Sequence, residues 1–251
     1  MSLHLSEMGL REALFLMFVC RGWAEPLRFA IVVYSCTPQD EAEAEWVTLL
    51  SRTYPLLRPS CKQRVRIHKR VGNVGCAETH GYLQAVLDNY DSLEGLADVL
   101  FFAHAHRTSW HYATPVDEQI ERVMRDVDYL SGQDFGNVYC NSNRVLATSE
   151  WGPSVSRSPE ELWSTMFRDT DIAFPFRDDA SVAFQYPCCG TFWVKTASVL
   201  RRPRSVYERV LQNAFNTSEH DNKHVVCGRV AESAWHVMFA DVNYVEKPEW
   251  C

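Results

Sequence analysis

The strongest constraint on the fold is a continuous apolar run near the start of the chain, RFAIVVYS over residues 28–35. The run is rich in β-branched residues and does not alternate with polar ones, which is typical of a strand buried on both faces and therefore of a parallel sheet. Thr37 and Pro38 follow it, with acidic residues just beyond, as at a helix N-terminus. The domain is thus expected to begin with a strand followed by a helix.

The same order continues through the first half of the chain. The alternating stretch 65–69 predicts a second strand, residues 76–89 predict a helix, and residues 98–103 predict a third strand. Two strand–helix units followed by a strand indicate an α/β fold. We therefore expect a single domain of the Rossmann-like type, with a mostly parallel central sheet flanked by helices.

The second half of the chain is expected to be less regular. Its predicted elements are a helix at 115–130, a long loop at 152–179 with a short helix near 160–167, a short strand at 190–194, and late helices at 206–215 and 229–239.

The N-terminus contains a short apolar core, residues 13–20, followed by Gly22-Trp23-Ala24 as a possible cleavage site. Its length fits a signal peptide and is too short for a membrane-spanning helix. The flanking charge is acidic where a signal peptide is usually basic, so an amphipathic helix of the domain is the alternative. We predict a signal peptide or signal anchor at 1–24 and the domain at 25–251. The protein is then expected in the secretory lumen or outside the cell, or in the cytoplasm if the segment is not a signal.

Cysteines, one sequon and net charge bear on compartment and partners. The chain has nine cysteines, and removal of Cys20 with the leader leaves an even number, which is compatible with disulfides. No Cys-x-x-Cys pair is present, which argues against a zinc ribbon. Asn216-Thr217-Ser218 is an N-glycosylation sequon. A net charge of −7 argues against nucleic acid as a partner, and against a membrane beyond the possible anchor.

Polar and aromatic residues are concentrated directly after the third predicted strand, in HAHRTSWH. His104 and His106 lie two residues apart and so share one face of a strand, where they can hold a divalent metal, orient a ligand, or only cap the strand. His111 can join them across a turn. Arg107 can clamp an anion or form a surface ion pair. Trp110 can stack on a sugar or base, or pack in the core.

Two further clusters are candidates for the same site, because ligands of α/β proteins bind outside the carboxyl ends of strands. Asn73 and Gly75 follow the second predicted strand, and glycine lets the backbone approach a ligand. Glu78 either lines that site or only favours the helix dipole. In the last predicted helix Glu232 and His236 are four residues apart and share a face. They can serve as a base and the group that orients it, as metal ligands, or only as a surface pair beside an apolar stripe.

Together these motifs resemble the family known as domain of unknown function 3431. The resemblance is carried by Asn-x-Gly-x-x-Glu-x-x-x-Tyr-Leu at 73–83, Phe-x-His-x-His-Arg-x-Ser-Trp-His at 102–111, Cys188-Cys189, and Gly228-Arg229-Val230 continuing to His236. It covers residues 29–239. The family name implies no activity.

In the order of its elements the chain is more distantly similar to glycosyltransferases of the GT-A type. That similarity implies transfer of a sugar from a nucleotide-sugar donor to a glycan or protein acceptor. Those enzymes usually carry a metal-holding Asp-x-Asp where this chain has His104-Ala105-His106. Three alternatives therefore stay open. The histidines hold a divalent metal (Mn, Mg or Zn), they contact the diphosphate directly, or the activity has been lost.

The implied site residues fall into two groups. The catalytic residues are Glu232, His236 and His111, and the residues that bind donor or substrate are Asn73, Gly75, Glu78, His104, His106, Arg107, Trp110 and Arg229. His104 and His106 are also the candidate metal ligands.

Two other functions are compatible with the sequence. A metal-dependent hydrolase can use His-x-His at a strand end, although the barrels that begin their metal site this way need eight strand–helix units, for which the chain leaves no room. A non-catalytic carbohydrate-binding protein can use Trp110, Trp193 and Trp235 as stacking surfaces.

Overall fold

A computed structural model gives the structure of the chain. It describes residues 27–34, 46, 50, 54–57, 77–104, 107–108, 114–138, 144–146, 159–174, 184–186, 190–216, 228 and 230–242. The predicted leader at 1–24 and the predicted strand at 65–69 lie outside these residues. Within them, no helix is both long and apolar enough to span a membrane.

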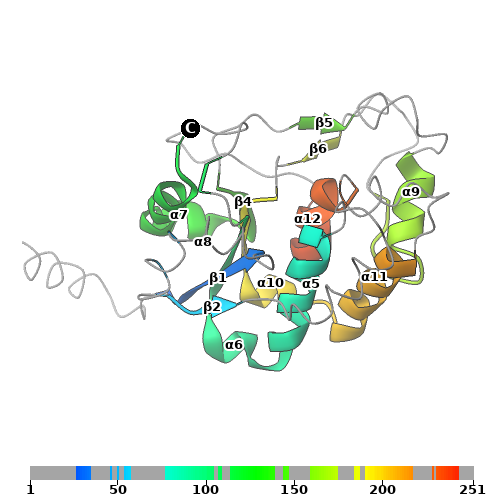
Figure 1. Cartoon of the computed structure of the whole chain (residues 1–251), viewed down its shortest axis with the longest axis horizontal. Coiled ribbons are helices and arrows are strands. Elements are labelled where there is room, and N and C mark those ends of the chain that lie inside the picture. The colour runs from blue at the N-terminus through cyan, green and yellow to red at the C-terminus, as the bar shows by residue number, and fades with distance from the viewer. Residues whose placement is uncertain are drawn as a thin grey trace, which may run out of the picture.

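A five-stranded sheet forms the centre of the molecule (Figure 1). Its strands, in spatial order, are β2 (Leu56–Leu57), β1 (Phe29–Tyr34), β3 (Val99–His104), β7 (Phe192–Lys195) and β4 (Phe135–Asn137). β1 is parallel to β2 and β3, whereas β7 is antiparallel to both β3 and β4. The fold is α/β, but the sheet is mixed, so the prediction of a mostly parallel sheet is wrong. A short apolar run such as 190–194 predicts a strand without giving its direction.

The strand register defines one edge of the sheet, which we term the carboxyl edge. Tyr34 and His104, the last residues of β1 and β3, pair with each other. Phe192, the first residue of β7, pairs with Phe102 of β3 and with Asn137 at the end of β4. Three strands therefore end, and β7 begins, at this carboxyl edge.

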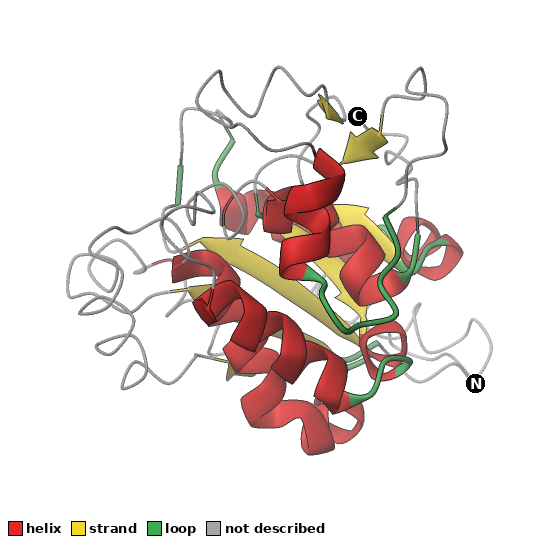
Figure 2. Ribbon diagram, turned by 90° about the vertical axis from the view of Figure 1, so that its right-hand side faces the viewer, coloured by secondary structure: helices red, strands yellow, loops and turns green. Residues whose placement is uncertain are grey.

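Helices cover both faces of the sheet, and residues of β3 alternate between them. Leu100 and Phe102 belong to the core shared with α5 (Ala77–Asn89) and α12 (Ala231–Ala240). Phe101 and Ala103 belong to the core shared with α7 (Val116–Arg125) and α8 (Val127–Gly132). Figures 1 and 2 show the two helical layers with the sheet between them. β3 is therefore buried on both faces, as its continuous apolar sequence predicts.

The remaining elements complete the layer on the α5 side and a small second sheet. They are η1 (Tyr90–Ser92), α6 (Leu93–Leu96), β5 (Arg144–Leu146), α9 (Pro159–Met166), β6 (Phe184–Tyr186), α10 (Thr196–Leu200) and α11 (Arg204–Asn216). β5 and β6 pair as a separate antiparallel sheet, at the top of Figure 1. α11 packs on α5, and α9 packs on α11.

Most predicted helices are confirmed, with one correction. The helices predicted near 160–167, 206–215 and 229–239 correspond to α9, α11 and α12. The helix predicted at 115–130 is broken at Asp126, which has a non-helical backbone and separates α7 from α8. The Asp126 carboxylate accepts a hydrogen bond from the backbone N–H of Tyr129 at 3.0 Å and so acts as the N-cap of α8.

Candidate functional site

The first turns of α5 and α12 both lie toward the carboxyl edge. α5 leads through η1 and α6 to the start of β3, at the opposite edge, so α5 begins near the carboxyl edge. Arg202 follows α10, beyond the end of β7, and donates hydrogen bonds to the carbonyls of Met238 and Val237 in the last turn of α12. The C-terminal end of α12 is therefore held at the opposite edge. Glu78 and Glu232, in the first turns of the two helices, are placed toward the carboxyl edge.

His104 occupies the centre of this edge. It is the last residue of β3, is half-buried, and pairs with Tyr34. Because side chains alternate along a strand, His104 lies on the same face as Phe102, which is the face covered by α5 and α12. The backbone positions of His104, Glu78 and Glu232 therefore lie toward the same edge, on the face of the sheet that α5 and α12 cover.

Tyr82 joins α5 to the start of β7 at the same edge. Its hydroxyl donates a hydrogen bond to the carbonyl of Gly190 at 2.7 Å, and its ring lies 5.1 Å from that of Phe102 and 5.6 Å from that of Trp235. Gly190 has φ of 59°, a left-handed conformation that favours glycine. Tyr82 belongs to the motif at 73–83, but the sequence alone gives it no role at this edge, because its hydrogen-bond partner lies far away in the chain.

Two buried polar groups near this edge have no hydrogen-bond partner among the residues described. They are the hydroxyl of Thr191, directly before β7, and the indole nitrogen of Trp235 in α12. Buried polar groups are normally paired with protein or ordered water, so each has the capacity to bind a further group. Thr191 was missed by sequence analysis, where it was only part of a predicted strand.

His236 lies one turn deeper in α12 than Glu232. Its side chain is fully buried, and its ring lies 6.0 Å from that of Phe135. Burial lowers the pKa of His236 to about 3, so the imidazole is neutral at physiological pH. Glu232 is only half-buried. The pair is therefore not a surface Glu–His pair, and His236 can orient a neighbour but carries no charge.

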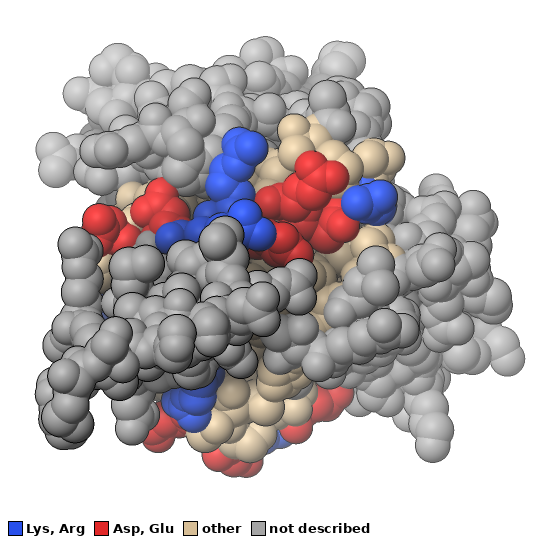
Figure 3. All heavy atoms as spheres, turned by 90° about the vertical axis from the view of Figure 1, so that its left-hand side faces the viewer, with Lys and Arg blue, Asp and Glu red and all other residues tan. Residues whose placement is uncertain are grey.

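Arg107 is engaged by the first turn of α7. Its Nε and Nη2 atoms each lie 2.9 Å from a carboxylate oxygen of Asp117, and Nη2 is 3.7 Å from Glu118. These carboxylates, Asp117 foremost, raise the pKa of Arg107. Figure 3 shows basic and acidic side chains next to each other on the described part of this side of the molecule. An anion at Arg107 would therefore have to compete with Asp117.

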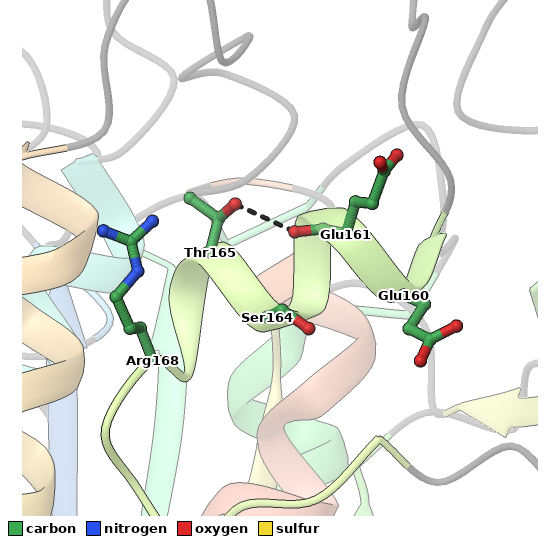
Figure 4. Close-up of a pocket in the computed structure, with 5 residues that line it drawn as sticks. All are labelled: Glu160, Glu161, Ser164, Thr165 and Arg168. Carbon is green, nitrogen blue, oxygen red and sulfur yellow. Dashed lines mark hydrogen bonds between the residues drawn. The ribbon is translucent and has the colours of Figure 1, made fainter.

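A shallow hollow of about 580 Å³ lies on α9, away from these residues, and is lined by Glu160, Glu161, Ser164, Thr165 and Arg168. Thr165 donates its hydroxyl to the carbonyl of Glu161 at 2.8 Å. Figure 4 shows the two carboxylates and the guanidinium pointing in different directions. The hollow includes no predicted site residue, and its charged groups do not converge on one point.

The other predicted site residues lie outside the described part of the chain. These are Asn73, Gly75, His106, Trp110, His111 and Arg229. Within that part, no group of three or more His, Cys, Asp or Glu side chains has the arrangement of a metal site. Trp193 and Trp235 are buried in the core, so neither presents a ring face to solvent as a stacking surface would require.

Comparison with known proteins gives one match. A family model described as "Protein of unknown function (DUF3431)" matches residues 39–251. No curated protein and no solved structure matches the chain.

Proposed function

Because the chain belongs to DUF3431, a family whose description names no reaction, we propose from the carboxyl edge itself that the protein is a GT-A-like glycosyltransferase. It would transfer a sugar from a nucleotide-sugar donor to a glycan or protein acceptor. The observation that carries the proposal is the convergence of His104 with the first turns of α5 and α12 at this edge. Ligands of α/β proteins bind at such an edge.

The donor diphosphate is assigned to the side of the site formed by His104 and the start of α5. The first backbone N–H groups of a helix and its dipole favour phosphate, and α5 is a helix of 13 residues. His104 and His106 take the place of the metal-holding Asp-x-Asp of GT-A enzymes. A divalent metal, where bound, would supply further positive charge for the leaving diphosphate.

The acceptor is assigned to the α12 side, with Glu232 as the base. In this mechanism the Glu232 carboxylate takes the proton of an acceptor hydroxyl, and the acceptor oxygen bonds to the anomeric carbon of the donor sugar. The bond from that carbon to the diphosphate oxygen breaks, and the nucleoside diphosphate leaves. Glu232 is only half-buried, so part of the residue is exposed to solvent at this edge. His236 lies one turn away, buried and neutral, so it supports the site by packing and not by its charge.

The proposal is tested with the full chain and two variants that separate binding from transfer. A panel of nucleoside diphosphates and nucleotide sugars, with and without Mn²⁺, Mg²⁺ or Zn²⁺, is screened for an increase in melting temperature. A ligand at a hundred times its Kd adds about 2.7 kcal/mol of stability. His104→Ala should lose the response, whereas Glu232→Gln should keep it and lose release of nucleoside diphosphate.

Arg125→Ala, a change at an exposed residue of α7, is the matched control and should leave both responses intact. Absence of any response to nucleotides in the folded wild-type protein would contradict the proposal. A response to metal alone would favour the hydrolase instead.

A further inference from the structure

Asn216 is the last residue of α11 and the first residue of the sequence Asn216-Thr217-Ser218. No other asparagine of the chain is followed two positions later by serine or threonine. An asparagine in this context accepts an N-linked glycan when the chain passes through the secretory pathway, provided that its side chain can be reached.

The packing of α11 places Asn216 on the solvent side of the helix. The buried residues of α11 are Tyr207, Val210, Leu211 and Ala214. Arg209 and Gln212 are exposed, and they lie seven and four residues before Asn216, which puts the three on one face. Asn216 itself is exposed. A large substituent on its side chain would therefore displace no buried contact.

A second asparagine of the same helix shows the opposite arrangement. The side-chain nitrogen of Asn213 donates hydrogen bonds to the carbonyls of Arg168 at 2.8 Å and Met166 at 3.1 Å. Its amide therefore ties α11 to the end of α9, and Asn213 does not belong to a sequon. Phe215, next to Asn216, packs its ring 4.2 Å from that of His80 on α5. The end of α11 is thus anchored by its neighbours, and Asn216 is left to project outward.

We propose that Asn216 is a modification site that carries an N-linked glycan. A glycan is transferred from a lipid diphosphate carrier to the side-chain amide of Asn216. The bond between the amide nitrogen and the anomeric carbon of the glycan forms, and the bond from that carbon to the carrier diphosphate breaks. The amide nitrogen loses one proton, and the lipid diphosphate is the leaving group. The inference does not depend on the function proposed above.

The test uses the full chain, with its own N-terminus, produced in a eukaryotic secretory host. The wild-type protein should migrate more slowly on a denaturing gel than after treatment with peptide-N-glycosidase F. That enzyme should leave aspartate at position 216 in the corresponding peptide, as measured by mass spectrometry. Ser218→Ala removes the sequon but keeps Asn216, and should abolish the shift. Thr217→Ala alters the same segment but keeps an Asn-x-Ser sequon, so the shift should persist.

Two outcomes would overturn the proposal. The first is a wild-type chain whose migration is unchanged by the glycosidase. The second is a shift that remains in Ser218→Ala, since the glycan would then lie elsewhere. Because the side chain of Asn216 is exposed, the melting temperature of Ser218→Ala should match that of the enzymatically deglycosylated wild type.

Discussion

Tyr82 and Gly190 lie 108 residues apart in the chain and are joined by a 2.7 Å hydrogen bond from the tyrosine hydroxyl to the glycine carbonyl. The bond fixes the turn that enters β7 against the helix that begins at the carboxyl edge. Tyr207 provides a natural comparison, because its buried hydroxyl also donates to a backbone carbonyl at 2.7 Å, that of Val199. Val199 lies in α10, beyond the far end of β7.

Tyr82→Phe and Tyr207→Phe should each lower the free energy of unfolding by about 1–2 kcal/mol, because each leaves a buried carbonyl without its donor. Urea denaturation measures both losses. Only Tyr82→Phe should also weaken nucleotide binding, since only Tyr82 supports the carboxyl edge. Equal effects of the two variants on nucleotide binding, after correction for stability, would contradict this placement of the site.

Gly136→Ala should destabilise the protein by about 1–3 kcal/mol through overpacking. Gly136 pairs with Trp193 across β4 and β7, and a Cβ atom there would overlap the Trp193 indole and the Tyr129 hydroxyl. Gly132→Ala is the matched control, because nothing lies within 4 Å of a Cβ at that position at the end of α8. Its free energy of unfolding should stay the same or rise slightly. Similar urea midpoints for the two variants would contradict the close packing at Gly136.

The parts of the fold that could be predicted are those whose local pattern is long enough. β1 and β3 follow from their continuous apolar runs, and α11 and α12 from helical spacing. β2 and β4, of two and three residues, are too short to show a period. The direction of β7 was not predictable either, because a run of four residues is too short to distinguish a parallel from an antiparallel strand. The break at Asp126 carries a recognisable N-cap residue, but the apolar stripe continues through it and suggested one helix.

The candidate site divides in a similar way. The position of His104 at the carboxyl edge follows from the rule that ligands bind at the carboxyl ends of strands. The position of Glu232 does not, because the contacts of Arg202 with the distant end of α12 determine how that helix lies. The hydrogen bond of Tyr82 and the burial of Thr191 depend on which distant segments pair, which no local pattern encodes. Arg107 was a candidate anion clamp by residue type alone, whereas its carboxylate partner becomes evident only when α7 is in place.

Lowering the pH should destabilise the protein through His236, over a pH range set by the pKa of this residue in the unfolded and folded states. Burial lowers the pKa of His236 to about 3 in the folded state, so the unfolded chain, with a value near 6.5, binds the proton more readily. The stabilising effect is complete above pH 6.5 and is lost as pH falls from 6.5 toward 3. The free energy of unfolding should decrease with a slope that approaches about 1.4 kcal/mol per pH unit.

His236→Gln isolates this contribution, and the range from pH 6.5 to 5 is the most informative because most carboxylates are still charged there. Urea denaturation across that range should give a flatter pH dependence for the variant than for the wild type. Parallel curves for the two proteins would show that His236 is not a buried neutral group.

Substitution of Arg202 should lower the stability of the protein strongly, because this buried arginine fixes the C-terminal end of α12. Its buried guanidinium contacts the carbonyls of Met238 and Val237, and it forms ion pairs with Asp171 at 2.6 Å and Asp241 at 3.0 Å. Arg202→Met should lower the free energy of unfolding by about 3 kcal/mol, mainly because the carbonyls in the last turn of α12 lose their charged donor. The two carboxylates stay in contact with solvent and add little to the loss. Arg202→Lys should recover only part of this loss, since an ammonium cannot reproduce the planar fork.

Arg125→Met is the control, because Arg125 forms an exposed ion pair with Glu121 along α7 at 3.0 Å. Such pairs contribute about 0.5 kcal/mol or less. Because α12 carries Glu232, Arg202→Lys should also affect the proposed reaction. It should reduce the rate of sugar transfer more than it reduces nucleotide binding. Single-turnover kinetics measure the first effect and a binding titration measures the second. Losses of stability as small as that of Arg125→Met would mean that α12 is held by its apolar face alone and that Arg202 has no part in positioning Glu232.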